Sequence, residues 1–224
     1  MTEQKAAGGW TEVEVAGERV ALLAERALFR PSVSTLYVAD PHWGKAATFR
    51  AAGVAVPGGT TAENTERLSR ALERTGASRL VFLGDLFHAR EGKAPATLAL
   101  LAEWRARHPR VAMSLVRGNH DRRAGDPPPS LAIEPCDPPC LSPPFVLAHH
   151  PVESPAGYVL AGHVHPSVTL LGRGRQRTRL PCFHFGARIG VLPAFGAFTG
   201  TADVEVAPGD RVFVVAGDEV LAVG

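Results

Sequence analysis

The chain has 224 residues, of which 45% are hydrophobic and 21% charged, and its formal net charge is +2. This balance is ordinary for a globular protein, is compatible with one well-packed domain over residues 1–224, and gives no general indication of a nucleic-acid partner. No apolar run approaches the roughly 18 residues that a membrane helix requires. The first residues, MTEQKAAGGWTEVE, lack the apolar stretch of a secretory signal.

The first half of the chain alternates strand and helix patterns. Apolar runs predict strands at 18–23, 34–39, 78–85 and 111–116. A helix is predicted over 61–75, where Leu68 and Leu72 repeat among charged residues and Gly76 follows, and another over 95–107, which has proline in its first turn. This alternation predicts a mostly parallel sheet covered by helices.

The second half is predicted to contain strands only. Residues 125–144 are rich in proline and predict an irregular surface segment. Short strands are predicted within 145–150, 157–165 and 167–172, and in the tail at 188–198 and 210–223, with a turn at 208–210 and no helix after residue 107. One sheet of mixed direction and two sheets packed face to face both fit this order.

The cysteines are few and give little chemistry. The chain has three, Cys136, Cys140 and Cys182. An odd number in these positions predicts no disulfide framework, so a reducing cytoplasm is the expected location. Cys136 and Cys140 lack further ligands of a thiolate metal site, and we interpret them as structural.

Polar side chains follow five of the predicted strands, at the point where each apolar run ends. They are Asp40 and His42, then Asp85 and His88, then Asn119, His120 and Asp121, then His149 and His150, and finally His163 and His165. Seven of the nine histidines lie in these positions, and only His108 and His184 lie elsewhere. Because the carboxyl ends of strands in an open α/β sheet converge on one crevice, these side chains are expected to meet.

Carboxylates, imidazoles and an amide oxygen are ligands of Mn²⁺, Fe or Zn²⁺, and the absence of thiolates among them argues against a structural zinc site. About seven such groups are too many for one ion, and they suit two ions that share a carboxylate roughly 3.5–4 Å apart, as in two-metal phosphoesterases. A single D-x-H or G-D after a strand is commonly only a turn. The five together, in this order, predict a metal centre.

The succession D-x-H, G-D, G-N-H-D, a later histidine and G-H-x-H resembles the calcineurin-like metallophosphoesterase superfamily over about residues 36–166. The resemblance implies a two-sheet sandwich flanked by helices, an αββα arrangement, with the metals at the carboxyl ends of the strands. It implies that Asp40, His42 and His165 hold one ion, that Asn119, His149 and His163 hold the other, and that Asp85 bridges them. It also implies that His120 is the general acid and that Asp121 orients it.

A narrower resemblance covers more of the chain. The stretches ADPHWGKAATFRAAGVAVPGGT, LGDLFHAR, VRGNHD, LAHHP, AGHVHP, RLPCF and VLPAFGAFTG resemble the bacterial DNA ligase-associated metallophosphoesterases. That group is found beside an ATP-dependent ligase, a helicase and an exonuclease, which implies DNA as substrate, a role in DNA repair and no membrane partner. Pro41 departs from the group's usual apolar residue. His88 departs from the superfamily, where an acid is common three residues after the G-D aspartate.

Several basic residues near the predicted centre are candidates for contacts with substrate phosphates, namely Lys45, Arg50, His88, Arg122, Arg123 and His150. Arg173, Arg175, Arg177 and Arg179 would share one face of a strand, either as a track for a nucleic-acid backbone or as a solvated hairpin. Mn²⁺ is the expected metal, with Fe and Zn²⁺ as alternatives. A nuclease or DNA-end phosphodiesterase, a phosphoesterase for a small nucleotide, and a non-catalytic phosphate- or DNA-binding subunit all remain open at this point.

Overall fold

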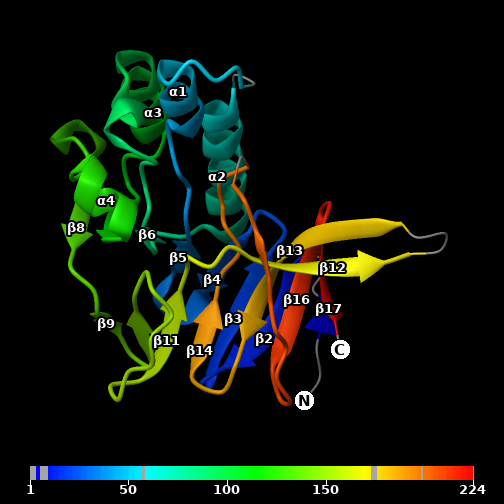
Figure 1. Cartoon of the computed structure of the whole chain (residues 1–224). Coiled ribbons are helices and arrows are strands. Elements are labelled where there is room, and N and C mark those ends of the chain that lie inside the picture. Colours follow the sequence, from blue (N-terminus) through cyan, green and yellow to red (C-terminus); the bar gives the residue numbers. More distant parts are fainter. Residues whose placement is uncertain (1–3, 6–9, 57–58, 173–175, 198, 224) are drawn as a thin grey trace.

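Two β-sheets pack face to face in a computed structural model of the chain, which describes residues 4–5, 10–56, 59–172, 176–197 and 199–223 (Figure 1). Helices lie on the outer side of the first sheet. They are α1 (Lys45–Ala51), α2 (Thr60–Thr75), α3 (Pro95–Arg107) and α4 (Asn119–Ala124), with short 3-10 helices at Pro31–Val33, Arg90–Lys93 and Pro129–Leu131. None of the helices in the described ranges is long and apolar enough to span a bilayer.

The first sheet changes direction along its width. Its strands, in spatial order, are β1 (Gln4–Lys5), β2 (Trp10–Val15), β3 (Glu18–Leu23), β4 (Ala27–Arg30), β5 (Thr35–Val38), β6 (Arg79–Phe82), β7 (Ala112–Val116) and β8 (Ile133–Cys136). Neighbours from β1 to β5 are antiparallel, whereas β5, β6, β7 and β8 are parallel. The loops that follow β5, β6 and β7 therefore all begin at the same edge of the sheet.

The second sheet is built from the rest of the chain. Its strands are β9 (Cys140–Ser142), β10 (Phe145–Leu147), β11 (Tyr158–Ala161), β12 (Pro166–Leu171), β13 (Arg177–Phe185), β14 (Ile189–Val191), β15 (Ala202–Asp203), β16 (Arg211–Ala216) and β17 (Glu219–Val223). β10, β11 and β14 run parallel to one another, and β13 is antiparallel to β12, β14 and β16. Figure 1 shows the β12–β13 hairpin extending beyond the body of the sandwich.

Alternation along β5 shows how the layers form. Leu36 and Val38 face the helices and join Leu68 of α2 and Trp104 of α3 in one buried cluster. Tyr37, one residue between them, faces the other sheet and joins a second buried cluster with strands β10, β11, β13 and β16. A strand buried on both faces reads as a continuous apolar run, which is why this half of the sheet was visible in the sequence.

The predicted fold class is confirmed, and the ranges of α2, α3 and β3 differ from the expected ones by one residue or none. In the described residues after Leu131 there is no helix, so the second outer helical layer of an αββα arrangement is not formed there. The prediction of no helix after residue 107 was wrong for α4, which has only six residues and is too short to show a helical period.

The proline-rich segment is more regular than expected. β8 pairs in parallel with β7 at the edge of the first sheet, and β9 pairs with β10 at the edge of the second. Edge strands tolerate proline because one side of the strand needs no N–H for pairing. Pro135 lies within β8.

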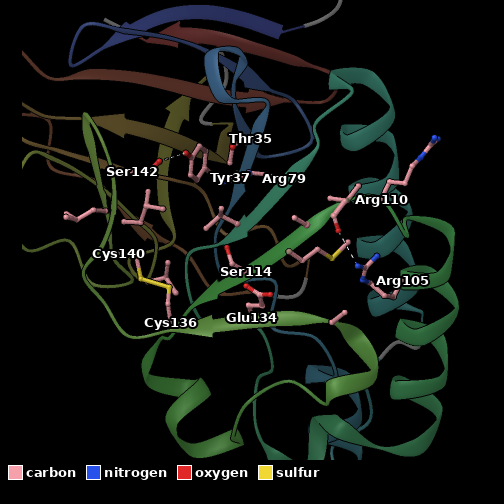
Figure 2. A pocket seen from close by; sticks show the side chains of 18 of the residues that line it. Thr35, Tyr37, Arg79, Arg105, Arg110, Ser114, Glu134, Cys136, Cys140 and Ser142 are labelled. Carbon is pink, nitrogen blue, oxygen red and sulfur yellow. Dashed lines mark hydrogen bonds between the residues drawn. A yellow bond between two sulfur atoms is a disulfide. The ribbon is translucent and has the colours of Figure 1, made fainter.

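A disulfide joins Cys136 at the end of β8 to Cys140 at the start of β9, which corrects the expectation that no disulfide forms. Both cysteines line a cavity of about 620 Å³ that opens between the two sheets. Figure 2 shows this cavity with the hydrogen-bonded pair Tyr37 and Ser142 on its wall. Cys182 is a buried free thiol elsewhere in the second sheet.

Candidate metal centre

The carboxyl ends of β5, β6, β7, β10 and β11 bring together the polar side chains that follow these strands in the sequence. Four groups of three have potential ligand atoms within 4.8 Å of one another: Asp40, His42 and His165; Asp40, Asp85 and His149; His149, His150 and His163; and His42, His88 and His120. The groups share members, so they form one continuous centre. The predicted convergence of the strand ends is thus seen in the structure.

The backbone at this centre is strained. Asp40, His42, Asp85, His163 and His165 all have left-handed backbone conformations, with φ between 46° and 70°. Such a conformation costs about 1–3 kcal/mol for a residue with a Cβ and persists only where the surroundings impose it. These five account for most of the non-glycine residues with positive φ among the described residues. The strained conformations of these residues lower the stability of the fold, and the surrounding structure imposes them to position these side chains.

Two histidines and one carboxylate form the first cluster, defined as Asp40, His42 and His165. The Nε2 atoms of His42 and His165 lie 3.3 Å apart, and Nε2 of His165 lies 3.5 Å from Oδ1 of Asp40. The backbone N–H of His163 donates to Oδ2 of Asp40 at 2.8 Å, while the buried Oδ1 has no hydrogen-bond partner. Nδ1–H of His165 donates to the Gly200 carbonyl at 2.9 Å, which leaves a lone pair on Nε2.

The second cluster is Asn119, His149 and His163. Nε2 of His149 lies 3.0 Å from Oδ1 of Asn119 and 3.1 Å from Nδ1 of His163. Nδ1–H of His149 donates to the Leu83 carbonyl at 3.0 Å, so Nε2 is the ring nitrogen that faces the cluster. Two imidazole nitrogens and an amide oxygen therefore face one point.

Asp85 lies between the two clusters and is buried. Its Oδ1 is 3.4 Å from Nε2 of His149, and its Oδ2 is 3.9 Å from Nε2 of His42. The backbone N–H of His120 donates to Oδ1 at 2.9 Å and holds the carboxylate in this orientation. Asp85 thus reaches toward both clusters.

The electrostatics of the centre favour cations. Burial lowers the pKa of His42 to about 2, so its ring is neutral. Burial acts to raise the pKa of Asp85, but the hydrogen bond and charge of His149 together with the His120 backbone bring it down to about 2. Burial alone would lower the pKa of His149, yet Asp85 and Asp40 raise it to about 9. The carboxylates therefore attract positive charge strongly at this point.

The donor spacing fits bound metal ions. Ligands at about 2.1 Å from a metal lie roughly 3.0 Å apart in an octahedral site and about 3.4 Å apart in a tetrahedral one. Five neighbouring pairs of donor atoms, in the two clusters and between Asp85 and His149, lie 3.0–3.5 Å apart. The unpartnered Oδ1 of Asp40 belongs to the same arrangement. The His/Asp clusters thus have the composition and geometry of a two-metal centre.

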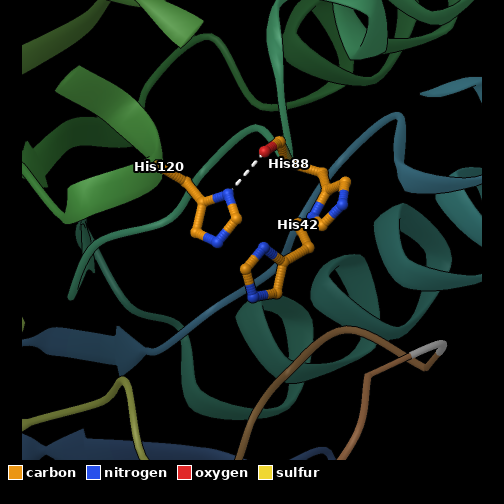
Figure 3. A group of neighbouring side chains, drawn as sticks. All are labelled: His42, His88 and His120. Carbon is orange, nitrogen blue, oxygen red and sulfur yellow. Dashed lines mark hydrogen bonds between the residues drawn. The ribbon is translucent and has the colours of Figure 1, made fainter. Parts of the chain in front are cut away.

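His120 lies on the first turn of α4, next to His42 of the first cluster. Figure 3 shows its ring facing those of His42 and His88, with a hydrogen bond to the backbone of His88. Nδ1–H of His120 donates to the His88 carbonyl at 2.6 Å, and Nε2 lies 3.8 Å from Oδ2 of Asp85. Nε2 is therefore the ring atom that faces the space between the clusters. His88 packs parallel to the His120 ring, with the ring centroids 5.0 Å apart.

Asp121 has partners other than the expected one. Its Oδ2 accepts the backbone N–H groups of Asp85 at 2.7 Å and of Gly118 at 2.8 Å, and its Oδ1 accepts that of Leu86 at 2.9 Å. This corrects the expectation that Asp121 orients the His120 ring, because the carbonyl of His88 does so. Asp121 instead fastens the end of β6 to the start of α4.

Asparagine at Asp121 is expected to destabilise the fold, because an amide NH₂ cannot accept the buried N–H groups. The amide oxygen can still accept at most two of the three, and leaving at least one unsatisfied should lower the free energy of unfolding by about 1–3 kcal/mol, measured by urea denaturation. The matched change Asp126→Asn alters a half-exposed carboxylate that pairs with Arg117, and it should cost about 1 kcal/mol or less. Equal losses in the two variants would contradict the buried role of Asp121.

The glycines of the strand-end motifs allow the close packing of this centre. A Cβ on Gly118 would lie 2.3 Å from Oδ1 of Asp85. A Cβ on Gly84, whose φ is +87°, would lie 2.1 Å from Nδ1 of His149. The G-D and G-N-H-D motifs therefore contain glycine because a neighbouring strand end places a functional side chain against the backbone.

The predicted substrate contacts do not all reach the centre. The charge of Lys45 acts on His42, His88 and His165, so Lys45 lies beside the first cluster. His150 is exposed and its ring centroid lies 4.1 Å from that of His163. Arg50 is exposed on α1 and lines a separate cavity of about 160 Å³ formed with α2 and α3, away from the clusters.

Arg122, another predicted contact, is exposed on α4. The pKa of His150 is lowered mainly by burial and by the charge of His149, and the charge of Arg122 adds to this effect. Arg123, one residue further, lines a cavity of about 460 Å³ with His88, Arg90 and His120. Its spacing of three residues from His120 on a helix is the sequence signal that places both on one side.

Sequence reasoning missed Lys93, which holds α4 in place. Its Nζ donates to the carbonyls of Ala124, Gly125 and Asp126 at 2.7–2.9 Å, at the carboxyl end of the helix. A cation there satisfies carbonyls that the helix leaves free and complements the helix dipole. Nothing in the sequence around Lys93 indicates this role, since the partner lies about thirty residues away.

Known proteins resemble the chain at the level of the whole fold. The crystal structure of the Pseudomonas putida nuclease MPE is 41% identical in sequence, with a TM-score of 0.84 over 96% of this chain and 100% of that chain. A structure of YfcE, a phosphoesterase from E. coli, is 19% identical with a TM-score of 0.39 over 82% of this chain and 88% of that chain, too distant to carry an argument. No family model and no curated protein matches the chain.

The match to nuclease MPE spans nearly the whole chain. This match agrees with the order of the motifs in the sequence and with the two His/Asp clusters around Asp85. The chain belongs to the calcineurin-like metallophosphoesterase superfamily, as a ligase-associated member, and is a metal-dependent phosphoesterase.

Proposed function

We propose that the chain is a nuclease that hydrolyses phosphodiester bonds of DNA with two divalent metal ions. The observation that carries this proposal is the placement of Asp85 between two clusters whose donor atoms have metal-ligand spacing. Asp40, His42 and His165 would hold one ion, Asn119, His149 and His163 would hold the other, and Asp85 would contribute to both. The 41% identical relative is itself described as a nuclease.

The bound ions would polarise a phosphoryl oxygen and make water acidic enough to attack at neutral pH. Asp40 and Asp85 supply the negative charge that holds two dications close together. Asp40 presents only Oδ1, because Oδ2 is occupied by the His163 backbone. His149 and His165 present Nε2, because carbonyl oxygens hold Nδ1–H of each ring. The protein thus orients these three donors before an ion arrives.

His120 acts as the general acid. Nδ1–H is fixed on the His88 carbonyl, so the proton that can be transferred sits on Nε2, on the side of Asp85. There it can protonate the alkoxide oxygen that leaves when the phosphodiester breaks, which contributes about 10²–10⁴ in rate. In this proposal Lys45, Arg122 and His150 contact the non-bridging oxygens of the substrate, and His88 packs against the His120 ring.

Mn²⁺ is the proposed metal, with Fe and Zn²⁺ as alternatives, because the donors are imidazole nitrogens and oxygens with no thiolate. The proposed setting is DNA repair in the cytoplasm, with a DNA ligase, a helicase and an exonuclease as partners. These partners follow from the ligase-associated resemblance of the sequence. The disulfide between Cys136 and Cys140 would be exposed to cytoplasmic reductants in that setting.

A second candidate is a phosphoesterase for a small nucleotide. It is favoured by the cavity of about 460 Å³ beside His88 and His120, which carries Arg90 and Arg123 on its wall. Pockets for small ligands have volumes of about 300–1,000 Å³, so a nucleotide would fit. The same metal centre would serve either substrate.

A gel assay with Mn²⁺ separates the candidates. End-labelled single-stranded, duplex and nicked DNA are incubated with the protein, beside a chromogenic diester, a monoester and a set of mononucleotides. The expected result is cleavage of at least one DNA substrate that is lost with EDTA and restored by excess Mn²⁺. Hydrolysis of mononucleotides with no DNA cleavage would overturn the nuclease proposal in favour of the second candidate.

A further inference from the structure

A cavity of about 470 Å³, separate from the clusters of the metal centre, is lined by arginines from three parts of the fold. They are Arg26 after β3, Arg67, Arg70 and Arg74 on α2, and Arg179 on β13. The three on α2 are spaced by three and four residues and therefore lie on one face of the helix. We call this the arginine cavity. Its wall also carries two carboxylates, Glu25 and Asp218.

Only part of this positive charge is compensated. Arg74 pairs with Glu25 at 3.0 Å, and Arg179 pairs with Asp203 at 2.8 Å. Within the described ranges of the chain, Arg26, Arg67 and Arg70 form no ion pair.

Arg26 and Arg67 are partly buried, whereas Arg70 is exposed. Burial, together with the charges of Arg26 and Arg70, lowers the pKa of Arg67 to about 10. Nε of Arg67 is buried without a hydrogen-bond partner, and its Nη2 donates to neutral oxygens, Oδ1 of Asn64 and the carbonyl of Phe195. Like charges held this way are unfavourable by themselves and favour an anion that satisfies them.

The arginine cavity adjoins the metal centre through one stretch of chain, of which the structure describes residues 194–197 and 199–200. On one side of this segment, the carbonyl of Ala194 accepts Nη1–H of Arg26, and the Phe195 ring packs 4.5 Å from the guanidinium of Arg67. On the other side, the N–H of Gly196 donates to the Asp40 carbonyl at 3.1 Å. The carbonyl of Gly200, as described above, accepts Nδ1–H of His165.

We propose that the arginine cavity binds a backbone phosphate of the DNA strand whose scissile phosphodiester lies at the metal centre. Guanidinium groups bind phosphate oxygens in a planar, two-point geometry, and a polynucleotide carries further phosphates on either side of the one being cleaved. Arg26, Arg67 and Arg70 make the contact. The proposal rests on the proposed nuclease function, because only a polymeric substrate has a second phosphate to offer.

The test compares cleavage of a long and a short substrate. For a single strand of about 20 nucleotides, Arg70→Ala is expected to lower kcat/KM about fivefold at 0.1 M salt and to reduce the salt dependence by about 0.7 in slope, the effect of losing one phosphate contact. Cleavage of a dinucleoside monophosphate should be unchanged by Arg70→Ala, because this substrate has only the phosphate that is cleaved. Arg70→Lys keeps the charge and should retain most of the salt dependence.

The control is Arg110→Ala, which removes an exposed arginine from the wall of the cavity between the sheets and should behave as wild type on both substrates. Equal effects of Arg70→Ala on the long and short substrates, or no effect on either, would overturn the proposal. The proposal would also be overturned if Arg70→Ala altered inhibition by millimolar inorganic phosphate but left strand cleavage unchanged. The cavity would then bind free phosphate and not the DNA strand. If wild type cleaves neither nucleic-acid substrate but hydrolyses mononucleotides, the proposed function itself fails.

Discussion

Alanine at Asp85 is expected to abolish both metal binding and hydrolysis. Asp85 reaches toward Nε2 of His149 with one oxygen and toward Nε2 of His42 with the other. Without it, two dications would lie side by side with no shared anion between them, and each cluster would lose a ligand. Metal content after gel filtration should fall from about two ions per chain to less than one, and diester hydrolysis by more than about 10³-fold.

A matched control exists in the same chain. Asp210 also contacts a histidine, with 2.7 Å between its Oδ2 and Nε2 of His184, but it lies outside the clusters. Asp210→Ala should therefore keep the metal content and the activity of wild type. If Asp85→Ala kept two ions per chain, the bridging role would be refuted, and an equal loss in both variants would indicate a general effect on folding.

Alanine at His120 is expected to separate metal binding from catalysis. The backbone N–H of residue 120, which donates to Oδ1 of Asp85, remains in the variant, so the carboxylate and both ions should stay in place. The lost imidazole removes the proton donor for the leaving oxygen. Hydrolysis of a diester with an alkoxide leaving group should fall by about 10²–10⁴-fold. A p-nitrophenyl diester should lose much less, because its leaving group departs without a proton.

The readouts are metal content and the two rates, measured on the same preparation. His184→Ala, which removes a histidine outside the centre, should leave all three unchanged. If His120→Ala hydrolysed the alkoxide diester as fast as wild type, His120 would not be the acid. If it lost its metals, its role would be structural, and the loss in rate would say nothing about proton transfer.

Much of the centre was predictable because its parts are local in sequence. Strands β5, β6 and β7 are buried along most of their length, so each appears as an apolar run, and the side chain that follows lies at the common edge of the sheet. The position of Asp85 after β6 needs only this rule. The helix α2 was equally visible, since Leu68 and Leu72 repeat at helical spacing and Gly76 ends it with φ of 61°.

The features that were missed depend on contacts between distant residues. The partners of Asp121 are three backbone N–H groups, two of them more than thirty residues away, and no side-chain pattern shows backbone donors. Arg50 lies close to His42 in sequence, yet the short helix α1 directs it to another cavity. The arginine cavity joins Arg26, α2 and β13, which only the packing of the two sheets brings together.

The most direct test of the account is a crystal structure of the protein soaked in Mn²⁺, with anomalous differences measured at the manganese edge. The account predicts two peaks on either side of Asp85, roughly 3.5–4 Å apart, one within reach of His42 and His165 and the other within reach of His149 and His163. A single ion held by His42, His88 and His120, or peaks away from Asp85, would contradict it.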